Sequence, residues 1–258
     1  MKHIFFIFLI LLCSKLALAE DRAISAIFSA EGVDGTIILK SLRADRTITH
    51  NDPRTSRRFA SASTFKIFNT LIAVQENVVS LEGTVFKWDG KAYDFPDWNR
   101  DQTLESAFKV SCVWCYQEIA KRVGEENYRR YLALARYGAL ANMNDVTTFW
   151  LDGSFTVSAV EQVALLKKIY LRELPFRDET YDALKRVMLS EQTDSYRLYA
   201  KTGWAARMSP QIGWYVGYVE TSDDVWFFSI NLSLRSEADL GLRQKITKAV
   251  LRAERIIP

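Results

Sequence analysis

The length, composition and charge of this chain exclude several classes of protein. Its 258 residues are 48% hydrophobic, 13% aromatic and 25% charged, which excludes an intrinsically disordered chain. Its formal net charge is +3, and its two histidines are His3 and His50. His3 lies in an N-terminal segment that is expected to be removed, so a Ser-His-Asp or Cys-His enzyme would have to use His50. The remaining chain cannot build a zinc site from two imidazoles.

Residues 1–19 have the pattern of a secretory signal peptide. Lys2 gives a positive start, residues 4–12 are apolar and residues 17–19 form an A-x-A cleavage site, so the mature chain is predicted to begin at Glu20 and to be periplasmic or secreted. Cleavage would remove two lysines and no acidic residue, leaving 32 basic against 31 acidic residues, which gives no reason to expect a nucleic-acid partner. No second apolar stretch of about 20 residues follows, so no membrane association is expected after cleavage.

The mature chain, residues 20–258, is expected to fold as a single domain, because no repeat, linker or charge block divides it. It begins with two predicted strands, residues 35–39 and 46–49, and Arg43-Ala44-Asp45 between them predicts a hairpin turn. Residues from about 63 to 190 are predicted to form a helical lobe, because apolar residues recur there at spacings of three and four. The predicted helices are 65–76, 113–123, 125–137, 158–170 and 179–188.

Strands return after this helical lobe. The predicted strands are residues 196–202, 212–220 and 225–232. In the second strand the residues that point to either face of a sheet are apolar, so both of its faces should be covered. An amphipathic helix over residues 238–255 then closes the chain. The expected architecture is α/β (α+β), with a mostly antiparallel sheet built from both chain ends and a helical insertion between them.

Ser63-Thr64-Phe65-Lys66 is an S-x-x-K motif at the start of a predicted helix, so the serine and the lysine share one helix face. Burial of Lys66 among its apolar neighbours would disfavour the charged ammonium, and a neutral amine beside a hydroxyl is a workable nucleophile and base pair. The motif is weak alone, since residues 106–109 have the same spacing. Without further support, Ser63 is a helix cap and Lys66 a solvated side chain.

Lys201-Thr202-Gly203 is a stronger signal, because it is predicted to end a strand. A cation, a hydroxyl and a glycine suit a carboxylate-bearing substrate that lies against the backbone like an added strand. Ser111-Cys112-Val113 falls between the two motifs, 48 residues after Ser63 and 90 before Lys201, at the start of a predicted helix.

S-x-x-K, S-x-V and K-T-G in this order resemble the motifs of the class D serine β-lactamases, the oxacillinase family. Further matches are residues 149–153 (FWLDG), 213–217 (GWYVG) and 241–243 (GLR). The resemblance covers nearly the whole mature chain. It implies the serine β-lactamase/transpeptidase-like fold, one catalytic domain, and hydrolysis of β-lactam antibiotics, above all penicillins, by a monomer or homodimer.

The resemblance also implies how the serine and its base would act. Ser63 would be the acylated nucleophile, and Lys66 would be carboxylated by CO2 or bicarbonate to N6-carboxylysine, the general base. Only an unprotonated amine reacts with CO2, so the apolar neighbours of Lys66 fit this expectation. Trp150 would hydrogen-bond the carbamate through its indole N–H, and neither a metal nor another cofactor is implied.

For substrate binding, the resemblance assigns residues from three segments. Ser111 would pass a proton to the leaving ring nitrogen, and Val113 would lie at the substrate. Lys201, Thr202 and Gly203 would hold the substrate together with Arg243, whose guanidinium can bind a carboxylate through two parallel bonds; otherwise Arg243 is a solvated helix residue. Backbone N–H groups of Ser63 and Trp204 would form the oxyanion hole.

Residues 137–139 depart from the family pattern, since Ala139 replaces the asparagine of Y-G-N. Asn142 is a candidate substitute for the missing amide. A second hypothesis pairs Arg207 with Asp152 across the mouth of the site, where the pair would set the substrate range.

Two alternative functions stay open, and the first of them uses the same residues. A penicillin-binding sensor or transpeptidase would also acylate the S-x-x-K serine but would not release the product by hydrolysis. Cys112 and Cys115 form a C-x-x-C, which opens a thiol-disulfide role. No βαβ pattern surrounds it, and Cys112 occupies the middle position of S-x-V, so we interpret the pair as two small packed side chains. A local disulfide stays open as an alternative, although helical geometry at this spacing would strain it.

Overall fold

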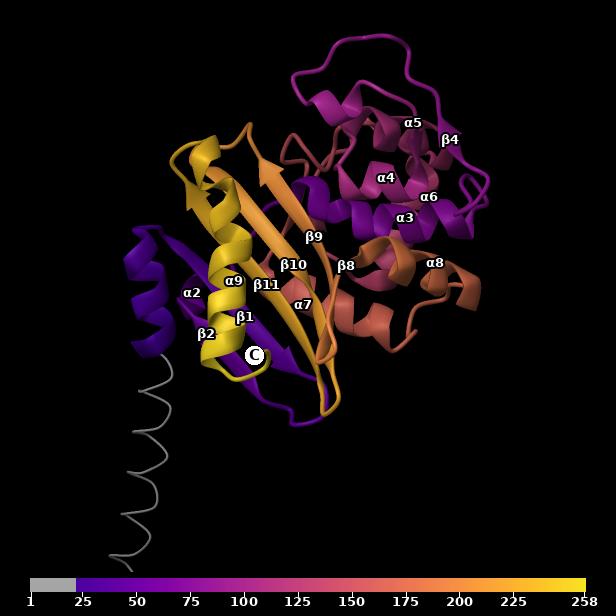
Figure 1. Ribbon diagram of the computed structural model, residues 1–258. Helices are drawn as coiled ribbons and strands as arrows, with labels where there is room; N and C mark the ends of the chain where they lie inside the picture. Colours follow the sequence, from indigo (N-terminus) through magenta and orange to yellow (C-terminus); the bar gives the residue numbers. More distant parts are fainter. Residues whose placement is uncertain (1–21) are drawn as a thin grey trace, which may run out of the picture.

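The computed structural model describes residues 22–258 (Figure 1). The predicted signal peptide and its cleavage site lie outside the described residues. Within residues 22–258, every helix is too short or too polar to cross a bilayer.

A six-stranded antiparallel sheet forms the middle of the molecule, with strand order β2-β1-β11-β10-β9-β8. Its strands are β1 (Gly35–Ser41), β2 (Thr47–His50), β8 (Leu189–Gln192), β9 (Tyr196–Ala205), β10 (Gln211–Thr221) and β11 (Val225–Leu234). Gly35 of β1 lies opposite Leu232 of β11, so the first strands of the sheet pair with the last. The predictions of a sheet built from both chain ends and of a hairpin joining β1 to β2 are therefore confirmed.

One face of this sheet is covered by the two ends of the described chain (Figure 1). Residues 22–31 form a helix that the sequence analysis did not predict, and α9 (Leu242–Ala253) follows the 3-10 turn η3 (Glu237–Gly241). Ile24 and Phe28 from the first helix are buried in one apolar cluster with Ile246 and Val250 from α9. The predicted C-terminal helix is thus confirmed, although its first turn is tighter than an α-helix.

The helical lobe lies on the other face of the sheet. Its α7 (Ala159–Tyr170) packs on β1 and β11, and α3 (Lys66–Gln75) runs through its middle, with nine of ten residues buried. The remaining helices are α4 (Leu104–Lys109), α5 (Val113–Val123), α6 (Glu125–Ala135) and α8 (Asp178–Met188). All five predicted helices of this lobe agree with the structure to within two residues at each end.

Short elements connect these layers and escaped prediction because none spans a full hydrophobic period. They are α2 (Asp52–Thr55), β3 (Phe59–Ala60), η1 (Ala62–Phe65), β4 (Val85–Phe86), η2 (Pro96–Trp98), β5 (Gln102–Thr103), β6 (Ala139–Leu140) and β7 (Phe155–Val157). One strand end was predicted wrongly: Lys201-Thr202-Gly203 lies inside β9, which continues to pair with β10 as far as Ala205. The motif is therefore held by the hydrogen bonds of the sheet.

Candidate active site

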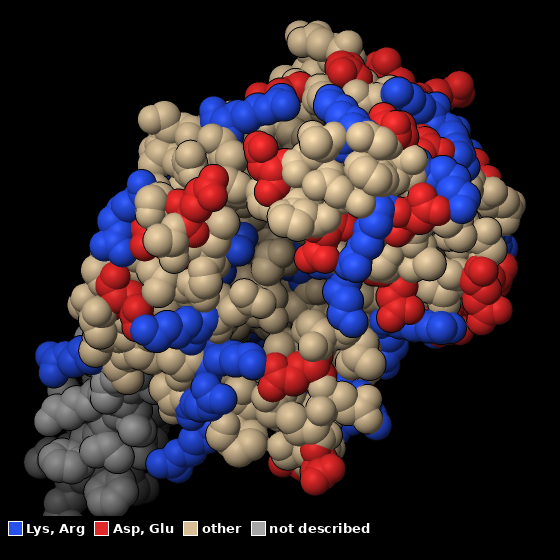
Figure 2. All heavy atoms as spheres, turned by 45° about the horizontal axis from the view of Figure 1, so that its top comes forward, with Lys and Arg blue, Asp and Glu red and all other residues tan. Residues whose placement is uncertain are grey.

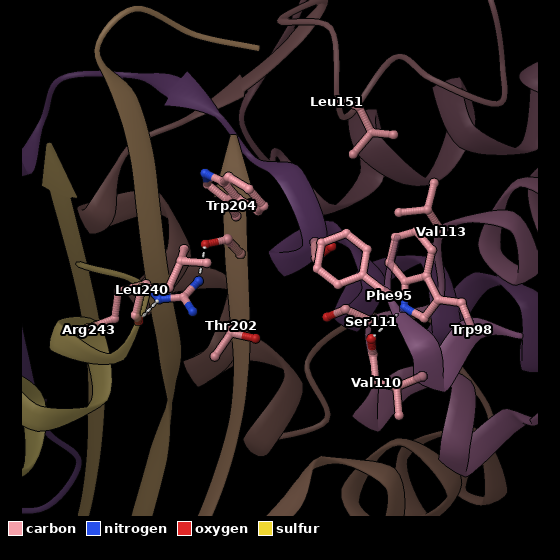
Figure 3. A pocket seen from close by; sticks show the side chains of 12 residues that line it. Phe95, Trp98, Val110, Ser111, Val113, Leu151, Thr202, Trp204, Leu240 and Arg243 are labelled. Atoms are coloured by element: carbon pink, nitrogen blue, oxygen red, sulfur yellow. Dashed lines mark hydrogen bonds between the residues drawn. The ribbon is translucent and has the colours of Figure 1, made fainter. Parts of the chain in front are cut away.

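A cavity of about 190 Å³ opens between β9 and the helical lobe (Figure 3). The predicted site residues in its lining are Ser63, Ser111, Val113, Thr202, Gly203, Trp204 and Arg243. Three further predicted residues lie behind this lining and are almost completely buried: Lys66, Trp150 and Lys201. The structure thus brings together all ten residues to which the sequence analysis assigned a direct role at the site.

Ser63 and Lys66 meet at the entry to α3. The 3-10 turn η1 runs into the α-helix, and the Lys66 ammonium nitrogen donates to Ser63 Oγ at 3.0 Å. Lys66 is 1% exposed, and burial lowers its pKa from 10.5 to about 7. Because no acidic side chain among residues 22–258 offsets this desolvation, a large fraction of the amine is neutral near pH 7, as the motif predicted.

Trp150 lies beside this pair and has an unsatisfied donor. Its ring stacks on Phe65 with centroids 5.9 Å apart, and its backbone oxygen accepts from Ala62 N at 2.8 Å, which holds the turn before Ser63. The indole N–H is buried and has no hydrogen-bond partner among the described residues. A buried N–H without an acceptor typically costs about 1–3 kcal/mol, so this position favours a group that brings an acceptor.

Ser111 links the helical lobe to β9. It adopts a left-handed backbone, φ 56°, between α4 and α5, and its Oγ accepts a short hydrogen bond from Lys201 Nζ. Lys201 also donates to Thr202 O at 3.1 Å and to Thr202 Oγ1 at 3.3 Å. Burial, followed by the positive charges of Lys66 and Arg243, lowers the pKa of Lys201 well below its ordinary value. Lys201 and Ser111 therefore form a hydrogen-bonded pair at the cavity.

Arg243 reaches β9 from the first turn of α9 (Figure 3). Its Nη1 donates to Gly203 O at 2.7 Å and its Nε to Leu240 O at 2.6 Å, and burial lowers its pKa to about 10. Gly213 permits this path, because a Cβ there would lie 2.9 Å from Arg243 Cδ. The alternative reading of Arg243 as a solvated helix residue is wrong, since the side chain is 8% exposed and lines the cavity.

Gly203 allows β9 to approach the nucleophile. A Cβ on Gly203 would lie 3.0 Å from Thr64 Cγ2 and 3.2 Å from Thr64 N, so the strand runs directly against the turn that carries Ser63. Next along β9, Trp204 donates through Nε1 to Gln211 Oε1 at 2.9 Å, which fixes its ring at the cavity wall. The glycine of the motif is therefore required for a close approach of two backbones.

Five lining residues were not predicted: Phe95, Trp98, Val110, Leu151 and Leu240. Phe95 and Trp98 form an aromatic wall with ring centroids 4.6 Å apart, and Trp98 Nε1 donates to Val110 O at 2.9 Å. Phe95 is 43% exposed. A sequence signal for this wall did exist: Phe95 and Trp98 stand in an otherwise polar segment, which is not expected to bury both aromatic side chains in the core.

Comparison with known proteins identifies the family. Residues 38–252 match the model of the penicillin binding protein transpeptidase domain. The chain is 41% identical over 239 residues to the β-lactamase OXA-48 of Klebsiella pneumoniae, covering 93% of this chain and 90% of that protein. It superposes on the class D β-lactamase FUS-1 (OXA-85) of Fusobacterium nucleatum with a TM-score of 0.88, at 34% identity and over 91% and 98% of the two chains. The chain belongs to the class D serine β-lactamases.

Further relatives agree with this assignment. The β-lactamase OXA-2 of Salmonella typhimurium is 40% identical over 234 residues, which cover 90% of this chain and 84% of that protein. The predicted family and its α/β fold are therefore confirmed.

Two hypotheses about this class D β-lactamase fail in the structure. Asn142 is exposed and does not line the cavity, so it does not replace the amide missing at Ala139. No ion pair joins Arg207 to Asp152 within residues 22–258. Instead, the carboxylate of Asp152 accepts from Ser154 N and from Thr148 Oγ1, and Arg207 is exposed to solvent. Hydrogen bonds within its own loop therefore occupy the Asp152 carboxylate.

Cys112 and Cys115 are both buried, as expected, and a disulfide joins them, which is the alternative that the sequence left open. Cys112 precedes α5 with an extended ψ of 111°, so the helical spacing that argued against a bridge does not apply to it. Its Cα lies 5.5 Å from that of Cys115, a usual separation for disulfides.

Proposed function

We propose that this protein hydrolyses β-lactam antibiotics, penicillins among them, through an acyl-enzyme on Ser63, and thereby gives resistance. The observation that carries this proposal is the contact of Ser63 Oγ with the buried amine of Lys66 at a cavity lined by Thr202 and Arg243. The names of the relatives, all β-lactamases, support the same substrate class.

In the acylation step, Ser63 Oγ attacks the lactam carbonyl while Lys66, already carboxylated as described below, takes its proton. The carbonyl oxygen becomes an oxyanion, which backbone N–H groups of Ser63 and Trp204 would stabilise; such a donor is typically worth about 2.7–4 kcal/mol. The C–N bond of the ring then breaks, and Ser111 gives the ring nitrogen a proton that Lys201 replaces. The short Lys201–Ser111 hydrogen bond supports this route.

Deacylation requires a base that remains strong when buried. The neutral amine of Lys66 would add to the carbon of CO2 and lose a proton, which gives N6-carboxylysine. The unpartnered indole N–H of Trp150 supports this modification, since a carbamate oxygen is the acceptor that it lacks. Carboxylated Lys66 would take a proton from water while the water oxygen attacks the ester carbonyl. The ester C–O bond to Ser63 would then break, and the carbamate would pass its proton to Ser63 Oγ as the opened product leaves.

Substrate orientation falls to β9 and α9. Arg243 is already bonded to Gly203 O, which leaves Nη2 for a substrate carboxylate, and Thr202 Oγ1 lines the same wall. Gly203 leaves the backbone of β9 open to the substrate. Val113 and Leu151 give the opposite wall an apolar surface. A carboxylate on one side and an apolar side chain on the other match the two ends of a penicillin.

One second candidate has a specific observation in its favour. The match to a penicillin binding protein transpeptidase domain is also what a non-hydrolysing sensor or transpeptidase would give. A thiol-disulfide role has no such support, because Cys112 and Cys115 are both fully buried and thiol exchange needs access.

The deciding experiment mixes the protein, in bicarbonate buffer, with excess chromogenic penicillin and records both ring opening and the mass of the enzyme. Sustained turnover with a transient adduct on Ser63 supports the β-lactamase. A single equivalent of product with a stable adduct would establish the sensor or transpeptidase instead. Ser63→Ala should abolish the adduct and Lys66→Ala should at least block its hydrolysis. The matched control is Ser106→Ala, which removes the serine of the second S-x-x-K, an N-terminal capping residue of α4 away from the cavity.

We also propose that the protein is exported after cleavage at Ala19. The Cys112–Cys115 disulfide supports this, since such bonds persist in oxidising compartments such as the periplasm. Sequencing the N-terminus of the protein recovered from periplasm and cytoplasm tests it: a chain that starts at Met1 in the cytoplasm would contradict export.

A further inference from the structure

We propose that the Cys112–Cys115 disulfide is a positioning element of the active site, which holds Ser111 against Lys201 and fixes the wall formed by Val113 and Trp98. This inference rests on the proposed β-lactamase function. The inferred role of the disulfide is to maintain the geometry of the proton-transfer step, in addition to any contribution to overall stability.

Ser111 needs external support because of its backbone. A non-glycine residue at φ 56° is in the left-handed region, which its surroundings must stabilise. On its N-terminal side, Ser111 N donates to Phe108 O at 3.2 Å, and on its C-terminal side Cys112 N donates to Ala107 O at 2.9 Å, so the end of α4 holds both flanking peptide groups. Beyond the Cys112 N–H, the next constraint is the covalent bond to Cys115.

That bond stands where a helix normally has a polar cap. Cys112 is the N-cap of α5, and its sulfur accepts from Cys115 N at 3.2 Å. Sulfur is a weak acceptor compared with the oxygen of a serine, threonine, asparagine or aspartate cap. The disulfide therefore supplies covalently the connection between the N-cap and the first turn of α5 that a capping oxygen supplies elsewhere.

The closed ring of residues 112–115 also contains two groups that shape the cavity. Val113 lies inside the ring and lines the cavity. Trp114 lies inside it too, and its Nε1 donates to Trp98 O at 3.1 Å, while Trp98 Nε1 donates to Val110 O at 2.9 Å. One four-residue ring therefore connects the proton-transfer serine, the apolar wall and the aromatic wall.

The other half of the catalytic apparatus is anchored by elements other than the ring, although α5 touches it where Lys66 Nζ lies 4.9 Å from the ring centroid of Tyr116, the residue after Cys115. Ser63 and Lys66 lie on η1 and α3, and Trp150 is joined to that turn through Ala62 N. Arg243 is held from α9 and β9. Opening the ring should therefore disturb acylation, which uses Ser111, and spare deacylation, which uses Lys66 and Trp150.

The test measures how strongly the disulfide is coupled to Ser111. Cys112→Ala/Cys115→Ala removes the bond, and Ser111→Ala is made with and without it. With the disulfide, Ser111→Ala should lower kcat/KM for a penicillin by about 10²-fold or more, as loss of a general acid does. Without it, the same substitution should cost less than about tenfold, because contacting groups that act together are not additive. Arg243→Ala, the matched control, should cost the same factor in both backgrounds.

Two further measurements separate positioning from folding. Hydrolysis of the preformed acyl-enzyme should proceed at the same rate in the open variant as in the wild type. Cys112→Ser/Cys115→Ala restores a capping hydroxyl without the bond; it should recover thermal stability relative to the double alanine variant and leave acylation slow.

The inference is overturned if Ser111→Ala costs the same factor in both backgrounds, if deacylation slows as much as acylation, or if the capping serine alone restores acylation. A wild-type protein with no turnover of any β-lactam would instead remove the proposed function, and with it this inference. The two failures are therefore distinguishable.

Discussion

Burial of the Lys66 amine without a counter-ion ties the proposed chemistry to pH. The pKa of about 7 means that protonation of the amine becomes dominant just below neutrality, and an ammonium cannot react with CO2. Trp150 adds to this dependence, because its N–H is satisfied only by an incoming acceptor. Both residues therefore favour the modified side chain at neutral and higher pH.

We expect turnover measured without bicarbonate to fall as pH decreases from 8 to 6, by about tenfold per pH unit below the pKa of Lys66. Added bicarbonate should restore part of the lost rate. The measurement is the steady-state rate at fixed penicillin over this pH range, with carboxylation quantified by 13C NMR of labelled CO2. If added bicarbonate changed neither the rate nor the NMR spectrum at any pH, the proposed carboxylated base would be contradicted.

The same buried amine lowers stability in bicarbonate-free buffer. The pKa of Lys66 is about 7 in the folded protein and about 10.5 in the unfolded chain, so the unfolded chain binds more protons between these pH values. The free energy of unfolding therefore rises with pH across this window, and the destabilisation is complete below pH 7. The ceiling for it is about 5 kcal/mol, from 1.36 kcal/mol per pH unit.

Lys66→Met, which keeps the shape and removes the charge, should therefore be more stable than the wild type. The difference should be largest below pH 7 and should shrink towards pH 10. Urea unfolding of both proteins at several pH values measures it. A difference that does not change with pH would mean that the folded protein does not depress the pKa of this amine.

At the scale of elements, β9 and α9 form one wall of the cavity because two glycines leave room for it. Gly203 lets β9 lie against Thr64, and Gly213 on the neighbouring strand leaves space for the Arg243 side chain. The position of the guanidinium is thus determined by the adjacent strand as well as by its own helix.

Gly213→Ala should displace Arg243, because the new Cβ would lie 2.9 Å from Arg243 Cδ. We expect KM for penicillins to rise by about ten- to a hundredfold, which corresponds to the 1.5–3 kcal/mol typical of a hydrogen bond to a charged group, with a smaller change in kcat. Gly241→Ala is the matched control, since nothing lies within 4 Å of its Cβ and its φ of −67° suits alanine. Equal KM values for the two variants would argue against this role of Gly213.

Periodicity predicted the long elements, whereas contacts distant in sequence determined what was missed. The five helices of the helical lobe and the strands β9 to β11 follow from spacings within one segment. The length of β9 depends on its pairing with β10, and the turn of Asp152 onto Ser154 and Thr148 depends on loop geometry that no spacing encodes. For the same reason, the motifs predicted most of the residues that the structure gathers at the cavity, while the aromatic wall of Phe95 and Trp98 was missed.

At the scale of the whole molecule, surface charges of both signs are interspersed. Figure 2 shows this on one face, without a large region of a single sign. Ion pairs such as Lys87–Asp101 and Arg129–Glu125 join side chains that remain about half exposed or more. Exposed pairs contribute about 0–1 kcal/mol each and are screened by salt.

We therefore expect that raising NaCl from about 0.05 to about 0.5 M changes the free energy of unfolding by less than about 1 kcal/mol, which is a change in Tm of no more than about 2–4 °C. Calorimetry at the two salt concentrations measures this. A larger loss of stability would mean that the surface pairs act as a network rather than singly.

The pairing of β1 with β11 has a consequence for how the protein is made. Gly35 and Leu232 are neighbours in the sheet although nearly the whole described chain separates them. A ribosome or translocation channel delivers β1 and β2 first, and the N–H and C=O groups along the edge of β1 that pairs with β11 have no partner until the last strands emerge. The newly made chain is therefore exposed to proteases and to aggregation until its synthesis is almost finished. Its yield in a cell depends on chaperones or other factors that cover this strand edge until β11 is available.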